Sequence, residues 1–408
     1  MRILVLTLLL GMTASNAFAA DAYLNGHWFE NGRFVARNAY VVNGYLSFDA
    51  PSSIDNTYDL AGRYVIPPFA EAHNHDLTSD FEPQERINEY LASGVFYAKM
   101  QSAFSKGFEK LSAHYNKPDS VDVIFAFAPV TGPGGHPIRI RELFFDRGYY
   151  DEFFDNKAEM DGIGYTRVRD RAELEKKIPS LIDQKPDFLK FMLSHSEEYM
   201  LRRDDPEFFG YKGLDPRLAP VLVKLAHEAG LRITAHIDTA ADFHNAVVAG
   251  VDEIAHLPGS RSIEVIRSKD AAMAAEKDIA VVTTISLTTK IKKAYPAYFE
   301  RIMKQHANNL NRLKDAGVRI LIGSDMPYRD NSVTEAFLLK DLSVFTNAEI
   351  LSMWCETTAR SIFPERKIGR LEEGYEASFL VLEGNPIEDF AYVRSINLRV
   401  KQGRRLNL

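Results

Sequence analysis

Hydrophobic residues alternate between two kinds of segment along the chain, and this alternation predicts the fold. Short, nearly continuous apolar runs are separated by longer stretches in which apolar residues recur with a helical spacing. Such runs are typical of parallel strands that helices cover. Eight of them favour a (β/α)8 TIM-like barrel over a doubly wound open sheet, because no glycine-rich phosphate turn follows an early strand. The runs lie at residues 64–69, 95–100, 121–130, 188–193, 231–237, 251–257, 279–285 and 318–322.

The two ends of the chain have a different pattern. Between residues 21 and 66, three Asn-Gly pairs separate short runs rich in aromatic and β-branched residues, and Asn-Gly is a strong signal for a hairpin. Residues 367–408 have a similar strand-rich character. We therefore expect both ends to build one small β-sandwich domain around a barrel at residues 67–366.

Residues 1–20 have the pattern of a secretory signal peptide. Arg2 precedes an apolar run at residues 3–12, and small residues follow it. The run is too short for a membrane anchor, since a spanning helix needs about 20 apolar residues. The sequence therefore predicts a periplasmic or secreted protein that has no membrane attachment after cleavage. Its single cysteine, Cys355, cannot form an internal disulfide.

Composition agrees with a globular enzyme that acts on a small molecule. The chain has 408 residues, of which 46% are hydrophobic and 26% charged. A net charge of −7 argues against nucleic acid as a partner. A homo-oligomer is compatible with the sequence.

Polar side chains interrupt or end several of the apolar runs. His73 and His75 point to the same face of a strand, so their two imidazoles could bind one cation. The other polar residues lie at or near the ends of later runs and are Lys190, His236, His256 and Asp325. In a barrel these strand ends form one rim, where the six side chains are expected to converge. One such histidine is more often a core residue, but six converging groups indicate a metal site.

These residues resemble the motif of the amidohydrolase superfamily, and the resemblance covers nearly all of the chain after residue 20. His73-Asn74-His75 matches the histidine pair of its first strand, and Gly323-Ser324-Asp325 matches the aspartate of its eighth. The strand-4 lysine and the strand-5 and strand-6 histidines are matched by Lys190, His236 and His256. The chain is similar to the branch that contains imidazolonepropionases and Xaa-Pro dipeptidases.

The resemblance implies a binuclear metal-dependent hydrolase that cleaves a C–N bond in an amide or dipeptide-like substrate. His73, His75 and Asp325 would hold one divalent ion, and His236 and His256 the second. A carbamate on Lys190 and a hydroxide, the attacking group, would lie between the ions. The imidazole-rich ligand set favours zinc. Asp325 would carry a proton from the attacking water to the leaving nitrogen.

Substrate contacts are expected in the loops after strands 3 and 4. His136 resembles the loop histidine of the dipeptidase branch, although Pro133-Gly134 interrupts the usual Thr-Gly-Gly-His run. His195 and Tyr211 follow strand 4 and are further candidates. The aromatic and basic loop at residues 131–170 could form a substrate pocket, an exposed lid or a partner interface.

Other functions stay open at the level of the sequence. A mononuclear deaminase-like enzyme would use Lys190 only as an ion-pair partner, and a lactone hydrolase could use the same groups. A catalytically silent binding protein is less favoured, because binding alone would not require Asp325.

Overall fold

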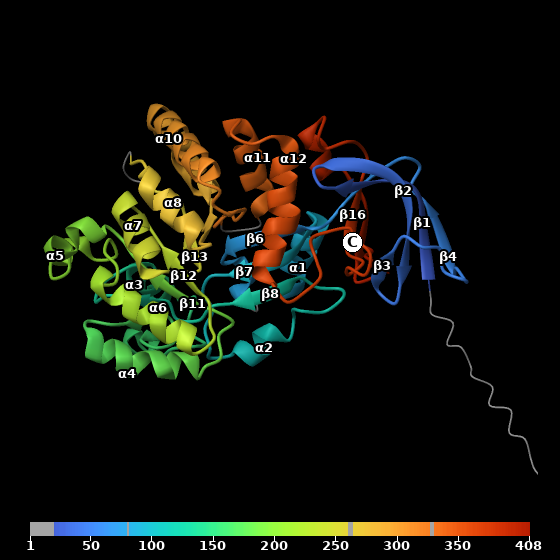
Figure 1. Ribbon diagram of the computed structural model, residues 1–408. Helices are drawn as coiled ribbons and strands as arrows, with labels where there is room; N and C mark the ends of the chain where they lie inside the picture. Colours follow the sequence, from blue (N-terminus) through green and yellow to red (C-terminus); the bar gives the residue numbers. More distant parts are fainter. Residues whose placement is uncertain (1–19, 80, 260–263, 327–329) are drawn as a thin grey trace, which may run out of the picture.

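The structure is a computed structural model that describes residues 20–79, 81–259, 264–326 and 330–408 (Figure 1). Residues 1–19 of the predicted signal peptide lie outside the described residues, and Ala20 begins the first strand. Within the described part of the chain, no helix combines the length and apolar character that crossing a bilayer requires. Figure 1 shows a β-rich part at one side of the molecule and an α/β part beside it.

The β-rich part is built from both ends of the chain. Eight strands share one sheet in the order β18-β17-β16-β5-β1-β2-β3, with β4 paired to β1. The ends meet where β5 pairs in parallel with β1 and antiparallel with β16. Because these pairings join all the strands, a single mixed sheet replaces the expected β-sandwich. The strands are β1 (Ala20–Glu30), β2 (Arg33–Val42), β3 (Tyr45–Ser47), β4 (Asn56–Asp59), β5 (Tyr64–Ile66), β16 (Phe379–Leu382), β17 (Ile396–Lys401) and β18 (Arg404–Arg405).

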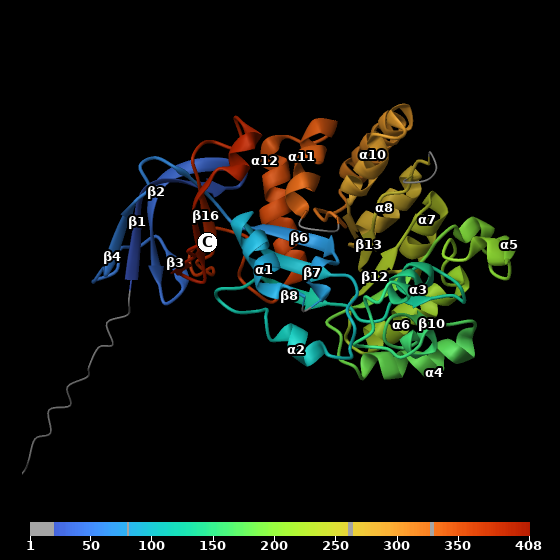
Figure 2. The ribbon, with the colours of Figure 1, turned by 180° about the vertical axis from the view of Figure 1, so that it is seen from behind.

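The α/β part contains parallel strands in a TIM-barrel-like order. A three-stranded sheet has the order β6-β7-β8, and a seven-stranded sheet has the order β10-β9-β11-β12-β13-β14-β15. Figure 2 shows the three-stranded sheet between the β-rich part and the other strands. The strands are β6 (Phe69–Asn74), β7 (Val95–Met100), β8 (Asp122–Phe125), β9 (Val130–Thr131), β10 (Thr166–Arg167), β11 (Leu189–Met192), β12 (Ile233–His236), β13 (Glu253–Ala255), β14 (Ala280–Val282) and β15 (Ile320–Leu321).

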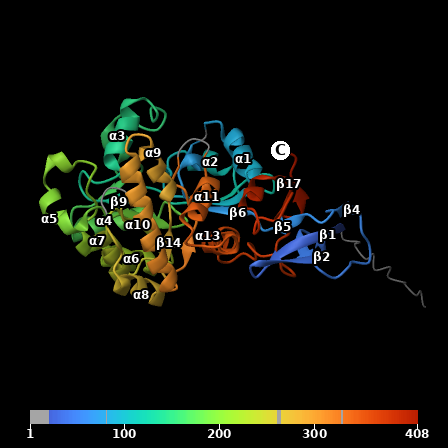
Figure 3. The same cartoon turned by 90° about the horizontal axis from the view of Figure 1, so that it is seen from above.

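Helices connect the parallel strands and surround them. Figure 3, a view from above, shows the β-rich part and helix α5 at opposite ends of the molecule. The helices are α1 (Pro83–Ala92), α2 (Phe108–Ser112), α3 (Ile138–Asp146), α4 (Arg171–Ile182), α5 (Tyr199–Arg202), α6 (Ala219–Glu228), α7 (Ala240–Ala249), α8 (Ser268–Glu276), α9 (Thr289–Lys292), α10 (Pro296–Asp315), α11 (Ser332–Leu342), α12 (Asn347–Leu351) and α13 (Thr358–Ile362).

The two sheets of the α/β part are linked on both sides. On one side the predicted strand at 121–130 is split into β8, which pairs with β7, and β9, which pairs with β11, so the chain itself runs from one sheet to the other. At the other edge the Ala72 N–H donates to the Ile322 carbonyl at 2.9 Å. The strand order therefore follows that of a (β/α)8 barrel, although the described strands do not form one continuous ladder.

The first predicted strand, at residues 64–69, is wrong in its extent. Residues up to Ile66 form β5 of the β-rich sheet, whereas the first barrel strand, β6, begins at Phe69. Pro67 and Pro68 separate the two, because proline has no N–H to donate to a strand ladder. The apolar run thus contains the crossing point between the two parts.

Asp122 joins the two parts through buried ion pairs. Its carboxylate, 2% exposed, accepts hydrogen bonds from Arg366 at 2.8 Å and from Lys401 on β17 at 2.6 Å. Asp122→Ala should lower the free energy of unfolding by about 3–5 kcal/mol, because it leaves buried charge unpaired. Asp278→Asn, which neutralises an exposed partner of Arg319 and tolerates the positive φ of residue 278, is the control and should change stability little. Urea unfolding measures both, and equal effects would contradict the prediction.

We predict that His306 makes the stability of the folded protein depend on pH. It is buried on α10, and neither ring nitrogen has a hydrogen-bond partner among the described residues. Burial lowers the pKa of His306 to about 4, below the value of about 6.5 expected in the unfolded chain. Between pH 4 and pH 6.5 the unfolded chain therefore binds more protons than the folded chain. The stability that the neutral, buried His306 contributes is present in full above pH 6.5 and is lost as the pH falls towards 4.

Between pH 7 and pH 5 the free energy of unfolding should fall by about 2 kcal/mol more in the native protein than in His306→Leu. Denaturant unfolding at both pH values measures the difference. A leucine variant with the same pH dependence would show that His306 is protonated in the folded protein.

Candidate metal centre

His73, His75 and Asp325 form a compact group of metal-ligand side chains. Asp325 Oδ1 lies 3.7 Å from His73 Nε2 and 3.4 Å from His75 Nε2. One ligand atom of each residue lies within 4.8 Å of the others. The Asp325 N–H donates to the His73 carbonyl at 2.7 Å, so the main chain holds the end of β6 against the segment after β15.

His236 and His256 continue the group at the ends of β12 and β13. The His256 ring centroid lies 4.8 Å from that of His73 and 4.5 Å from that of His236. His256 Nδ1 shares a hydrogen bond with Thr284 Oγ1 at 2.7 Å, which leaves Nε2 for another ligand. The structure therefore brings the four predicted histidines together.

Lys190 lies among these histidines. It is buried on β11, and its Nζ lies 3.3 Å from His73 Nε2. Burial lowers the pKa of Lys190 to about 7, against the opposing charges of Asp325 and Glu253. A second buried lysine, Lys99, differs because it donates to Glu253 at 2.8 Å. Lys190 is thus the lysine that is both close to the histidines and easily deprotonated.

His73, His75 and His256 are held in their neutral form. Burial, followed by the charge of Lys190, lowers the pKa of His73 well below its usual value, and burial does the same for His256. Burial and the positive charges of Lys190 and Arg141 lower the pKa of His75 well below its usual value. Because the His75 side chain is 42% exposed, we attribute this shift chiefly to the two charges. Neutral imidazoles have the lone pairs that metal binding needs.

Glu71 binds the chain next to two candidate ligands, at His73 and at Ser324, which precedes Asp325. Its buried carboxylate accepts hydrogen bonds from the His73 N–H at 3.1 Å, the Ser324 N–H at 2.8 Å and Ser324 Oγ at 2.7 Å.

Burial raises the pKa of Asp325 to about 6. Asp325 and His256 have φ angles of 49° and 80°, a region that non-glycine residues rarely adopt. The surrounding hydrogen bonds therefore hold these two candidate ligands in backbone conformations that are unfavourable for their residue types.

The predicted substrate residues have different positions. The His136 ring stacks on that of His236 at 4.8 Å, and the His136 N–H donates to the Lys212 carbonyl at 2.7 Å. His195 Nδ1 lies 3.6 Å from Glu197 Oε1. Tyr211 is 38% exposed, and its ring lies 5.0 Å from the guanidinium of Arg139 on α3. The structure thus brings His136 to the predicted ligands by direct ring contact and places Tyr211 at the surface beside α3.

Two residues near the centre were missed by the sequence analysis. Asp238 Oδ1 lies 3.7 Å from His236 Nε2, and Asp238 Oδ2 accepts a hydrogen bond from Ser194 Oγ at 2.5 Å. Ser102 Oγ lies 3.3 Å from His75 Nδ1. Asp238 could have been found because it follows His236 by two positions, whereas no pattern marks Ser102.

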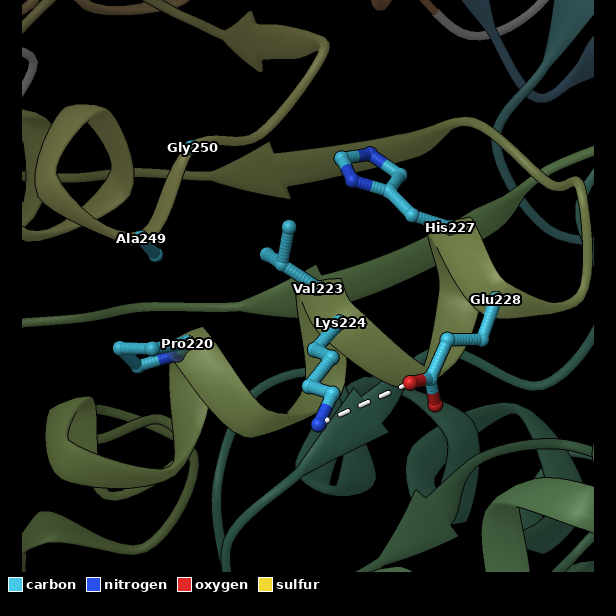
Figure 4. A pocket seen from close by; sticks show the side chains of 7 residues that line it. All are labelled: Pro220, Val223, Lys224, His227, Glu228, Ala249 and Gly250. Atoms are coloured by element: carbon cyan, nitrogen blue, oxygen red, sulfur yellow. Dashed lines mark ion pairs between the residues drawn. The ribbon is translucent and has the colours of Figure 1, made fainter.

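A groove on the outer surface is unrelated to this chemistry. Figure 4 shows it between α6 and the end of α7, with Lys224 and Glu228 paired at 3.6 Å. His227 and Gly250, which also line it, lie at the C-terminal ends of these helices. In alternating β/α units those ends lie opposite the rim that carries the metal-ligand side chains.

Comparisons with known proteins identify the family. Residues 204–406 match the model of the amidohydrolase family. Ochratoxinase from Aspergillus niger is 24% identical over 193 residues, which are 47% of this chain and 40% of the relative. The aligned segment thus spans less than half of that curated relative.

Solved structures share the fold over almost the whole chain. A crystal structure of A. niger ochratoxinase matches with a TM-score of 0.74 and 17% identity, covering 95% of each chain. A Xaa-Pro dipeptidase with bound methionine has a TM-score of 0.73 at 15% identity, covering 96% of this chain and 100% of the dipeptidase. The family match over residues 204–406 assigns the chain to the amidohydrolase superfamily, and these solved structures show that the fold extends over almost the whole chain.

Proposed function

We propose that the protein is a metal-dependent hydrolase that cleaves the C–N bond of a small amide or dipeptide-like substrate. The observation that carries this proposal is the approach of His73, His75 and Asp325 ligand atoms to within 4.8 Å, beside two further histidines. The family match supports it, as do neighbours described as an ochratoxinase and a Xaa-Pro dipeptidase.

We infer that these donor groups would hold two divalent ions, for which zinc is the preferred candidate. His73, His75 and Asp325 would hold one ion, and His236 and His256 the other. When bound, the ions would supply a nucleophilic water near neutral pH and polarise the substrate carbonyl. Lys190 suits the bridging role, because with a pKa of about 7 part of its amine is unprotonated, the form that reacts with carbon dioxide to give a carbamate.

The residues of the chain would then position the substrate and move one proton. Asp325 would accept a proton from the attacking water and deliver it to the leaving nitrogen. Its main-chain bond to His73 and its position beside His75 fix the carboxylate for that transfer. His136, stacked on His236, would contact the substrate at the opposite side of the centre.

A mononuclear hydrolase is the second candidate. The observation that favours it is the Lys190 Nζ to His73 Nε2 distance of 3.3 Å, since an unmodified lysine there would act as a hydrogen-bond partner. Such an enzyme would hold one metal ion per chain and would need no carbamate.

Elemental analysis of zinc-loaded protein, combined with a hydrolysis screen, tests these proposals. We expect close to two ions per chain and turnover within a panel of dipeptides, N-acyl amino acids and lactones. One ion per chain with turnover would favour the mononuclear enzyme. Turnover of lactones alone would contradict C–N cleavage, and a fully loaded protein that hydrolyses none of these classes would contradict the proposed function.

A further inference from the structure

Arg141 is a half-buried cation that has no acidic partner in the part of the chain that the structure describes. It lies on α3, in the long segment between β9 and β10. One guanidinium N–H donates to Ser102 Oγ at 2.6 Å, and another donates to Tyr150 Oη at 2.8 Å. Both partners are neutral, and among the described residues Arg141 forms no ion pair. Its positive charge is therefore not balanced within the described chain.

This charge lies close to the metal centre. Ser102 Oγ, which accepts the hydrogen bond from Arg141, lies 3.3 Å from His75 Nδ1. A single hydroxyl group thus separates the guanidinium from a candidate metal ligand. A fixed positive charge at this position opposes cation binding, because like charges repel. A negative group of a bound substrate would remove that conflict.

An aromatic cluster outside the main core fixes the guanidinium. The Arg141 Cζ atom lies 5.0 Å from the Phe104 ring centroid and 5.8 Å from that of Tyr150. The buried members of the cluster are Phe104, Ile138, Phe154, Met160 and Tyr165. Stacking on rings leaves the edge of a guanidinium accessible, and described residues use only two of its five N–H donors. This arrangement suits a planar carboxylate.

We propose that Arg141 binds a carboxylate of the substrate, so that the substrates are amides or peptides with a free carboxylate near the scissile bond. The inference rests on the proposed function, which places the scissile bond at the metal centre. The carboxylate would lie on the His75 side, because the Arg141 guanidinium approaches the metal centre there, through Ser102. The loop at residues 131–170 would therefore have a substrate-binding role.

Binding of two matched, unreactive ketones tests the proposal without relying on turnover. The probes are 3-benzoylpropanoate, in which a methylene replaces the amide nitrogen of N-benzoylglycine, and the uncharged diketone 1-phenylpentane-1,4-dione, in which a methyl group replaces one carboxylate oxygen. Calorimetry on zinc-loaded protein should show that the acid binds about tenfold or more tightly than the diketone. Arg141→Gln should abolish this preference without changing the affinity for the diketone or the metal content.

Arg139→Gln is the control, since Arg139 lies on the same helix but is exposed and stacks on Tyr211. It should keep the preference for the acid. A native protein that binds both probes equally or not at all would overturn the proposal. An Arg141→Gln protein that keeps the preference for the acid would also overturn it. The same holds for an Arg141→Gln protein that loses metal and binds both probes more weakly, because Arg141 would then act only on His75 through Ser102. A separate hydrolysis assay distinguishes these results from failure of the proposed function.

Discussion

Asp325→Asn should lower kcat by about 10²–10⁴-fold or more while the metal ions stay largely bound. The amide oxygen can still coordinate weakly, and the four histidines and Lys190 are unchanged. Asparagine, however, cannot accept a proton from water and pass it to a leaving nitrogen. The main-chain bond from residue 325 to the His73 carbonyl is independent of the side chain, so the local fold should persist. Steady-state kinetics and elemental analysis on the same preparation measure the two effects.

Substrate affinity separates this role from a structural one. Loss of a group that acts only in the transition state lowers kcat and kcat/KM together and leaves KM nearly unchanged. Asp238→Asn is the comparison variant, because it removes another carboxylate near the histidines. Near-native turnover in Asp325→Asn would assign proton transfer to another group, and His136 would be tested first because its ring contacts that of His236.

Lys190→Ala should lose activity and at least one metal ion per chain, and a short carboxylic acid such as acetate should restore part of both. The alanine side chain cannot form a carbamate, but an added carboxylate can occupy the space and bridge the ions. The native carbamate itself should be detected by carbon-13 labelling with bicarbonate.

Lys99→Met is the matched control for this rescue. Lys99 is buried in the same barrel-like part, where it bonds to Glu253 at 2.8 Å and to Thr234 at 3.0 Å. Its loss should reduce stability, because Glu253 is left buried and unpaired, and acetate should not reverse that effect. An active, metal-loaded native protein with an unmodified Lys190 ammonium would contradict the predicted bridge.

The parts of the site that could be predicted from the sequence share one property. His236, His256 and Asp325 end apolar runs, so their positions follow from the alternation of strands and helices. The parallel order of the strands then brings distant residues to one rim. The family model covers these three residues but not His73, His75 or Lys190, which the fold places beside them.

The remaining features depend on contacts that no local pattern encodes. Ser102 reaches His75 only because of the local course of the chain after β7, and Arg141 reaches Ser102 only because the segment after β9 folds back on its aromatic cluster. The sheet of the β-rich part is also non-local, since β5 joins strands from opposite ends of the chain. Register over such separations is set by tertiary packing rather than by the residues of one strand.

The shared sheet has a consequence for biosynthesis. Until β16 and β17 emerge from the ribosome, β5 lacks its antiparallel neighbour and Asp122 lacks the Lys401 ammonium. A nascent or truncated chain therefore exposes an unpaired strand edge, the kind of surface on which chains aggregate. Because the last-made strands complete the sheet, proteolysis or premature termination before β16 should yield chains that quality control removes rather than a functional barrel fragment.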